Sequence, residues 1–234
     1  MRRVVEPELL DELPPADNRA VGSRADLRRL NFLLGHADII SRALGRQFAE
    51  NSSRSRPVRM VELGAGDGTL LLRLARRAAA LGLTAEVILL DRQNIVSAET
   101  HRDFAALHWP VECATADVFA WLQQSASSVE VMFANLFLHH FPDELLSALF
   151  RLAAVRTNLF IACEPRRSPL ALAASRLLGL IGCNSVTRHD AVLSVRAGFL
   201  GRELSALWPA DNKWQLREQP AGLFSHCFMA KRNG

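Results

Sequence analysis

Residues 61–75 have the sequence VELGAGDGTLLLRLA, and this stretch gives the strongest structural signal in the chain. An apolar run over 58–63, which carries the carboxylate of Glu62, leads into three glycines at alternate positions, and an apolar helical pattern follows at once. Glycines permit a tight turn and the close approach of a ligand. The first turn of a helix offers free N–H groups to an anionic group. The stretch therefore predicts a strand, a ligand-binding loop and a helix in direct succession.

Strand-like and helical patterns alternate from this unit onward. Strand-like runs occupy 58–63, 85–91, 111–116, 129–137 and 158–164, and helical patterns occupy 67–81, 95–107, 118–124 and 142–155. Short apolar strands separated by helices predict a parallel sheet that is covered on both faces. Two further strand-like runs within 214–232, on either side of Pro220 to Gly222, predict a terminal antiparallel hairpin.

Helical patterns without strands flank this alternation. Residues 1–22 predict a loose lead-in, and Ser23 to Glu50 predict an amphipathic helix or helix pair that begins at Ser23 or Asp26. An insertion over 166–212 follows the fifth strand and holds helical stretches over 169–181 and 190–207. We therefore expect a helical cap with its linker over 1–56 and a main domain over 57–234.

Composition excludes several classes of protein. The 234 residues include 49% hydrophobic and 22% charged side chains, which excludes a disordered or coiled-coil chain. The most apolar window, 169–183, is shorter than the roughly 20 residues that a membrane span requires. The N-terminus is interrupted by prolines and does not resemble a signal peptide, and four scattered cysteines predict neither disulfides nor a zinc site. We expect a soluble, cytoplasmic protein without a metal site.

Acidic residues follow the second and third strand-like runs. Asp91 ends the run 85–91, and Asp117 follows the run 111–116. In open α/β sheets, ligands bind at the carboxyl ends of the strands, where a carboxylate can accept hydrogen bonds from a ribose. Asp91 is therefore a candidate for ribose binding, and Asp117, beside Val118, is a candidate for binding an adenine amine. Capping of the following helix is the alternative role of each acidic residue.

Together, Glu62, the glycine loop and the two acidic residues resemble the cofactor site of class I S-adenosylmethionine (SAM)-dependent methyltransferases. The resemblance implies a Rossmann-like α/β fold with a mainly parallel seven-stranded sheet, helices on both faces and an antiparallel C-terminal hairpin. It also implies that the loop holds the methionine part of SAM and that S-adenosylhomocysteine (SAH) is the product. The candidate cofactor-binding residues are Glu62, Gly64, Ala65, Gly66, Asp67, Gly68, Asp91, Arg92, Asp117, Val118, Asn135 and Leu136.

Two adjacent histidines, His139 and His140, follow the fourth strand-like run in NLFLHHF, 135–141. This segment is similar to the part of the family that faces the transferable methyl group. Methyl transfer needs a base only where the acceptor carries a proton, and histidine accepts protons near neutral pH. The pair is therefore the candidate catalytic group. The alternative is that one of the two packs against the following helix.

The cap and the insertion are the expected acceptor-binding elements. Their apolar side chains predict a lid over an apolar acceptor, with packing against the sheet as the alternative. The candidate contact residues are Asn31, Phe32, His36 and His189. Asp190 follows His189 directly, so helix capping is the alternative role of that pair.

The arrangement resembles methyltransferases that act on small polyketide, phenolic or quinone-type molecules of secondary metabolism. Residues 135–138 are NLFL, in place of the aromatic–proline motif typical of amino methylation on nucleic acids. Transfer to oxygen is therefore favoured, with carbon second, and nucleic acid is not the expected partner. A lipophilic acceptor would bring transient contact with a membrane surface, and we expect a monomer or a homodimer.

Three other functions stay open. An RNA methyltransferase would use the surplus of arginine that gives the chain its formal net charge of +4. A nicotinamide-dependent oxidoreductase would hold its ribose with Asp91, but Thr69 stands at the third glycine position and the chain has no tyrosine. A non-catalytic SAM-binding regulator would keep the loop and lose the chemistry.

Overall fold

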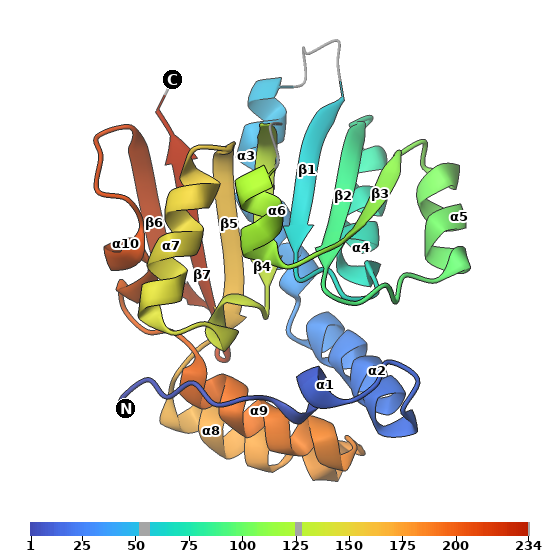
Figure 1. Ribbon diagram of the computed structural model, residues 1–234, viewed down its shortest axis with the longest axis vertical. Helices are drawn as coiled ribbons and strands as arrows, with labels where there is room; N and C mark the ends of the chain where they lie inside the picture. The colour runs from blue at the N-terminus through green and yellow to red at the C-terminus, as the bar shows by residue number, and fades with distance from the viewer. Residues whose placement is uncertain (52–56, 125–127, 234) are drawn as a thin grey trace.

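The computed structural model describes residues 1–51, 57–124 and 128–233. Its centre is a seven-stranded sheet in the order β3-β2-β1-β4-β5-β7-β6 (Figure 1). The strands are β1 (Val58–Leu63), β2 (Ala85–Asp91), β3 (Val111–Thr115), β4 (Val129–Asn135), β5 (Thr157–Pro165), β6 (Trp214–Ala221) and β7 (Ser225–Arg232). Strands β1 to β5 pair in parallel, and β7 pairs antiparallel with β5 and β6. The predicted mainly parallel sheet with a terminal antiparallel hairpin is confirmed.

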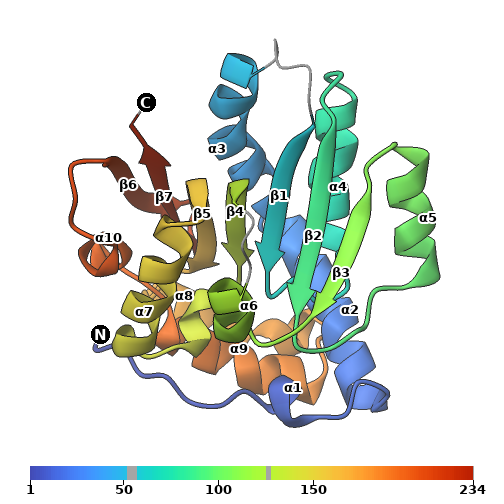
Figure 2. The ribbon, with the colours of Figure 1, turned by 45° about the horizontal axis from the view of Figure 1, so that its top comes forward.

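Helices cover both faces of the sheet, as two views show (Figures 1 and 2). One face carries α3 (His36–Asn51) and α4 (Thr69–Ala79), with α5 (Ala98–Ala106) beside the edge strand β3. The other face carries α6 (Val118–Gln124), α7 (Asp143–Ala154) and α10 (Glu203–Leu207). Successive strand residues alternate between the two cores: Val87 and Leu89 of β2 join the first, and Ile88 and Leu90 join the second. Both faces are buried, which explains the continuous apolar runs in the sequence.

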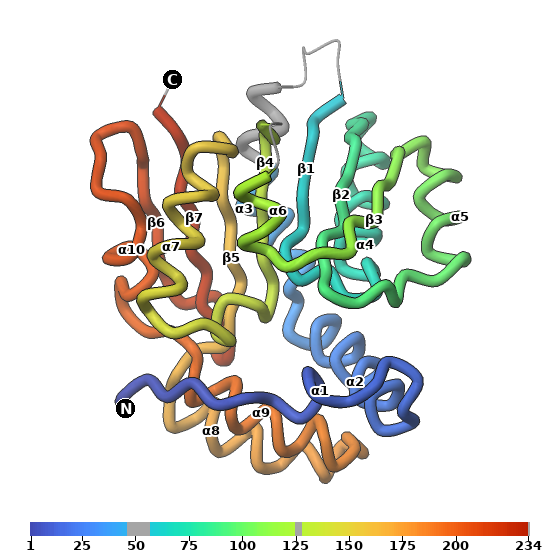
Figure 3. Tube along the Cα trace, in the orientation of Figure 1, coloured from blue at the N-terminus to red at the C-terminus, as the bar shows by residue number. Residues whose placement is uncertain are grey.

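The remaining helices form a separate layer, which we call the cap layer. It consists of α1 (Leu9–Glu12), α2 (Asn18–Leu33), α8 (Pro169–Arg176), the short η2 (Leu178–Ile181) and α9 (Ser185–Ala197). The layer lies at the edge toward which the parallel strands point, and the N-terminal arm runs along α9 (Figures 1 and 3). The N-terminal segment and the insertion, far apart in the sequence, are therefore neighbours at the edge where ligands bind in α/β sheets.

Helix α2 begins at Asn18, five residues before the predicted start at Ser23. Asp17 is its N-cap, and the Asp17 carboxylate accepts a hydrogen bond from the N–H of Arg19. Ser23 and Asp26 are instead buried inside the helix. The Ser23 hydroxyl and the Asp26 carboxylate each lie within hydrogen-bond distance of the hydroxyl of Thr187 on α9. The two residues join the halves of the cap layer rather than starting a helix.

The second helical stretch of the insertion also differs from the prediction. The sequence predicts a helix over 190–207, but α9 begins at Ser185 with Asn184 as its N-cap and ends before Gly198. A Cβ at Gly198 would lie 2.3 Å from the carbonyl oxygen of Pro165, so the chain passes too close to β5 for a side chain there. A separate short helix, α10, follows. Among the helices of the described residues, none combines the length and the apolar character needed to cross a membrane.

Replacing Phe150 by alanine should destabilise the fold by about 3–5 kcal/mol. The Phe150 ring is fully buried on α7, and its centroid lies 5.0 Å from that of Trp208, 5.5 Å from Phe160 and 5.7 Å from Phe228. Urea unfolding measures the effect. Leu145→Ala on the exposed side of the same helix is the control and should change stability by no more than about 0.5 kcal/mol. An equal loss of unfolding free energy in both variants would contradict this account of the core.

Candidate functional site

The glycine loop between β1 and α4 lies at the carboxyl edge of the sheet, next to the cap layer (Figure 1). Gly64, Gly66 and Gly68 have φ angles of +67°, +55° and +73°, in the left-handed region that favours glycine. At Gly64 a Cβ would also lie 2.3 Å from the ring of Phe137. The loop conformation therefore requires glycine, and Phe137 packs against it from the end of β4.

Asp91 ends β2 beside this loop. Its two carboxylate oxygens accept hydrogen bonds from the N–H groups of Gly66 and Gln93, each at 2.8 Å. The alternative role, capping of α5, falls to Ser97. A carboxylate has about four acceptor positions, so Asp91 retains capacity for ligand hydroxyls. The adjacent Arg92 is exposed.

Glu62 lies beneath the loop and is only 2% exposed. Within the described part of the chain, its Oε2 has no hydrogen-bond partner. Burial raises the pKa of this carboxyl well above its usual range, and the charges of Asp67 and Asp91 raise it further. A buried polar atom without a partner is costly. The three carboxylates would therefore favour a donor or a positively charged group in the loop.

Asp117 and Val118 follow β3 at the start of α6. The Asp117 Oδ1 accepts hydrogen bonds from the N–H groups of Phe119 and Ala120, at 2.9 and 3.2 Å. The capping role considered from the sequence is therefore present. Val118 is buried in the core and offers almost no surface to an adenine ring. Contact of adenine with the exposed Asp117 carboxylate stays a prediction.

Asn135 and Leu136 lie where β4 ends. Leu136 has a φ of +51°, an uncommon backbone conformation for a residue other than glycine. Asn135 is buried, and its Nδ2 donates to Oδ1 of Asn31 on α2 at 3.2 Å. No partner for Asn135 Oδ1 is found among the described residues. Backbone strain beside an unsatisfied amide oxygen is typical of a binding site.

Comparison with protein families agrees with this geometry. Residues 60–157, which contain the loop, Asp91, Asp117 and the end of β4, match the family model described as a methyltransferase domain. This part of the chain is therefore similar to a methyltransferase domain. The resemblance to class I methyltransferases that Glu62, the glycine loop and the two acidic residues indicated is confirmed, and so is the Rossmann-like fold that it implied.

Solved methyltransferase structures have the same fold. Magnesium protoporphyrin IX methyltransferase from Synechocystis PCC 6803 with bound SAH is 16% identical, with a TM-score of 0.55 over 85% of this chain and 84% of that one. Plantazolicin methyltransferase, in complex with a triazolic desmethyl analogue and SAH, is 12% identical, with a TM-score of 0.62 over 96% and 93%. An O-methyltransferase family protein from Burkholderia thailandensis is 15% identical, with a TM-score of 0.54 over 94% and 64%. No curated protein matches the sequence.

The cap layer contacts the glycine loop through α2. Arg28 Nη1 lies 2.7 Å from Asp67 Oδ2, and Asn31, one turn later, accepts the hydrogen bond from Asn135. Phe32 is 70% exposed, and the guanidinium of Arg73 lies 5.4 Å from its ring centroid. Arg28 was not among the candidates. Its only signal in the sequence is the i,i+3 spacing to Asn31, which puts the two on one helix face.

His36 is fully buried at the start of α3. Its Nδ1 lies 2.7 Å from Oδ1 of Asn31, and its Nε2 lies 3.0 Å from the hydroxyl of Ser225 in the hairpin. Burial lowers the pKa of this imidazole to about 4, so the ring is neutral at physiological pH. His36 therefore offers no surface to an acceptor in this arrangement, and its contacts position Asn31 instead.

His139 lies between two carboxylates in η1 (Leu138–His140), directly after β4. Its Nδ1 is 2.8 Å from Oε2 of Glu164, and its Nε2 is 3.3 Å from Oε1 of Glu8. Burial opposes charging of the ring, but these two carboxylates outweigh it and raise the pKa of His139 to about 9. His139 therefore holds a proton at neutral pH, and this arrangement does not favour it as a proton acceptor.

His140 and His189 are more accessible. The His140 ring stacks on His139 with centroids 4.3 Å apart, and its Nδ1 lies 3.2 Å from Oδ2 of Asp11. His189 is half exposed on α9, and its Nδ1 lies 2.9 Å from Oδ1 of Asp190. The Asp190 carboxylate also accepts hydrogen bonds from the N–H groups at the start of α1. The N-cap of α9 is Asn184. The acceptor contact expected for His189 stays a prediction.

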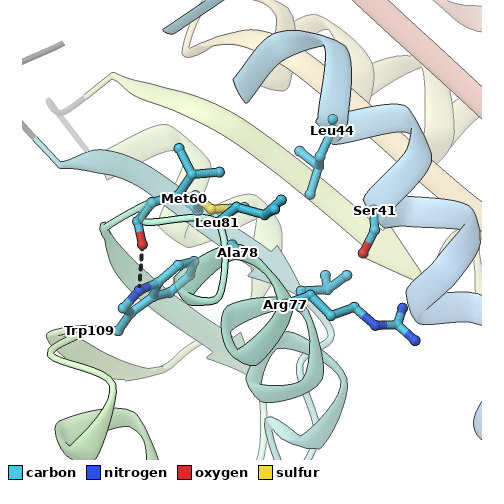
Figure 4. A pocket seen from close by; sticks show the side chains of 10 residues that line it. Ser41, Leu44, Met60, Arg77, Ala78, Leu81 and Trp109 are labelled. Carbon is cyan, nitrogen blue, oxygen red and sulfur yellow. Dashed lines mark hydrogen bonds between the residues drawn. The ribbon is translucent and has the colours of Figure 1, made fainter. Parts of the chain in front are cut away.

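An apolar cavity of about 210 Å³ lies at the opposite edge of the sheet (Figure 4). Its lining includes Leu44 of α3, Met60 near the start of β1, Leu81 and Trp109. Parallel strands begin at this edge, whereas the glycine loop follows the other end of β1. This cavity is therefore separate from the glycine loop and the residues around it.

Stability should fall as the pH is lowered, in part because of His36. The folded state keeps this ring neutral down to a pKa of about 4, whereas the unfolded imidazole takes up a proton near pH 6.5. The unfolded state therefore binds more protons between these values, and the loss attributable to His36 should reach about 2 kcal/mol at about pH 5. Urea unfolding of wild type and of His36→Gln, each at about pH 7 and at about pH 5, measures this contribution.

The control for that measurement is His108→Asn, which removes an exposed histidine at a φ of +57° that asparagine tolerates. It should keep the wild-type dependence of stability on pH, whereas His36→Gln should show a shallower one. Identical slopes in His36→Gln and wild type would contradict the assignment.

Proposed function

We propose that the chain transfers a methyl group from SAM to a small, largely apolar acceptor. The observation that carries this proposal is the acidic glycine loop, where Glu62, Asp67 and Asp91 lie together and the buried Oε2 of Glu62 lacks a partner among the described residues. SAM brings a positively charged ammonium and a sulfonium to such a loop. A nicotinamide dinucleotide would instead bring a pyrophosphate, whose negative charges these carboxylates oppose.

The proposed cofactor contacts follow the geometry of the carboxyl edge. The loop from Gly64 to Gly68 would hold the methionine part, with its ammonium toward Glu62. Asp91 would accept the ribose hydroxyls with its remaining acceptor positions, and Asp117 would accept the adenine amine. Asn135 and Leu136 would border the reacting end. The bound SAM and SAH in methyltransferases of the same fold support this assignment.

The cap layer supports an apolar acceptor. Phe32 and Leu33 at the end of α2 are exposed, as are Leu180 and Ile181 of η2. Arg29 on α2 donates to the carbonyl oxygen of Ile181, so these apolar residues belong to adjoining parts of the layer. The fold neighbours include enzymes named for a porphyrin and for plantazolicin, and an O-methyltransferase family protein. We propose an oxygen atom of a ring-containing small molecule as the acceptor, with carbon second.

Methyl transfer from a sulfonium is an in-line displacement, so positioning of the two reactants supplies much of the rate. The predicted catalytic pair, His139 and His140, lies at the same edge, directly after β4. We propose that His139, held between Glu8 and Glu164, positions this segment. His140 is the member of the pair with an exposed side.

Titration calorimetry with SAH, and with NAD in parallel, tests the proposed cofactor. SAH alone should bind, and Asp91→Ala should weaken that binding by about 1–3 kcal/mol through lost charge-assisted hydrogen bonds. Glu99→Ala, which removes an exposed carboxylate on α5, is the control and should bind SAH as wild type does. Binding of NAD alone would support the oxidoreductase, and binding of neither would contradict the proposal. SAH binding without turnover of phenols, quinones or RNA would favour the regulator.

Arg28 should hold the methionine carboxylate. Its guanidinium lies beside the loop, and the ion pair with Asp67 places it where that carboxylate would arrive. Arg28→Gln should weaken SAH binding about tenfold and leave binding of 5′-methylthioadenosine, which lacks the amino-acid part, unchanged. Arg29→Gln, on the same helix and paired with Asp26, is the matched control. An equal loss for both ligands would show that Arg28 acts through the fold rather than on the carboxylate.

A further inference from the structure

Glu8, His139 and His140 form a cluster of metal-ligand side chains at the carboxyl edge. One ring nitrogen of each histidine and a carboxylate oxygen of Glu8 all lie within 4.8 Å of one another. Glu8 comes from the N-terminal arm, and the histidines come from η1 after β4. The scattered cysteines predicted no metal site, but none of these ligands is a cysteine, and Glu8 is far from the adjacent histidines in the sequence.

The nitrogen of His139 that faces Glu8 is free to act as a ligand. Its Nε2 is buried, lies 3.3 Å from Glu8 Oε1, and has no partner with the geometry of a hydrogen bond in the described part of the chain. The opposite nitrogen, Nδ1, is 2.8 Å from Glu164 Oε2. Histidines that bind metals characteristically donate their other ring N–H to a carboxylate, which fixes the tautomer and the ring orientation.

His140 shows a similar arrangement at the edge of the cluster. The carboxylate of Asp11 lies 3.2 Å from its Nδ1, and the side chain of His140 is 23% exposed. Glu8, Asp11 and Glu164 bring three carboxylates to the two rings, so the surroundings favour an added positive charge. The exposed side of His140 gives an ion a route to the cluster.

We propose that Glu8, His139 and His140 bind a divalent transition-metal ion, and that Zn²⁺ is the ion that suits these ligands best. Two imidazoles and one carboxylate are a ligand set that Zn²⁺ uses in sites with an open fourth position. The ion would take the place of the proton on Nε2 of His139, which faces Glu8 at 3.3 Å. It would also tie the N-terminal arm to the segment after β4. The proposal concerns the metal alone and does not depend on the proposed function.

Metal titration of the purified, chelator-treated chain tests the proposal. Co²⁺, followed by its visible d–d absorption, should bind at one equivalent per chain, and Zn²⁺ should displace it. Either ion should raise the midpoint of thermal unfolding, because binding to the folded state alone stabilises that state. Glu8→Gln and His140→Gln should each weaken the binding at least about tenfold, which is the scale expected for a lost ligand contact.

His108→Asn is the control, because it removes an exposed histidine outside the cluster and should bind Co²⁺ as wild type does. Thermal unfolding without metal shows whether each variant folds. Should Glu8→Gln fail to fold, His140→Gln decides the question, because its side chain is partly exposed. Absence of saturable binding would overturn the proposal. Binding that is unchanged in the folded variants would overturn it too, since the ion would then lie elsewhere.

Discussion

The arrangement of the carboxyl edge depends on one buried carboxylate, Glu164 at the end of β5. It has no exposed surface. Its carboxylate accepts hydrogen bonds from the N–H groups of Phe137 and Leu138, and its other oxygen faces Nδ1 of His139. Burial raises the pKa of this carboxyl, but the bonds from His139 and from the two backbone groups outweigh it and lower the pKa. A buried charge without these donors would cost several kcal/mol. The segment after β4 must therefore stay where it supplies them.

Two contacts extend this constraint to the rest of the site. Phe137 packs against Gly64 and so fixes one side of the glycine loop. His139 reaches Glu8 of the N-terminal arm, and the start of α1 is held in turn by Asp190 of α9. The loop, the end of β4 and the cap layer are thus connected through one charged cluster. A change in that cluster should therefore alter the positions of both the glycine loop and the cap layer.

The sequence was sufficient for the sheet and the glycine loop because their signals are local. Alternating apolar runs predicted the five parallel strands and the terminal hairpin, and the helix over Val118–Gln124 was predicted with the bounds that it has. The cap layer could not be predicted in the same way. Ser23 and Asp26 are common helix caps, but here they bind Thr187 on a distant helix. Such contacts depend on the tertiary fold, and for the same reason the ion pair between Arg28 and Asp67 has no local signal in the sequence.

Several arginines join elements of the fold through ion pairs with carboxylates. Arginine presents a planar fork of donors that suits pairing with carboxylates. Such pairs join α2 to the loop, α4 to α5, and α4 to α3, through Arg28–Asp67, Arg76–Asp103 and Arg77–Asp38. An RNA-binding face needs cations that are free to reach phosphates. Beside the glycine loop, Arg28 is engaged by Asp67 and Arg73 lies over the ring of Phe32. The arginines described beside the loop are thus engaged in contacts between elements, and the acidic loop with its apolar cap is the better guide to the ligand.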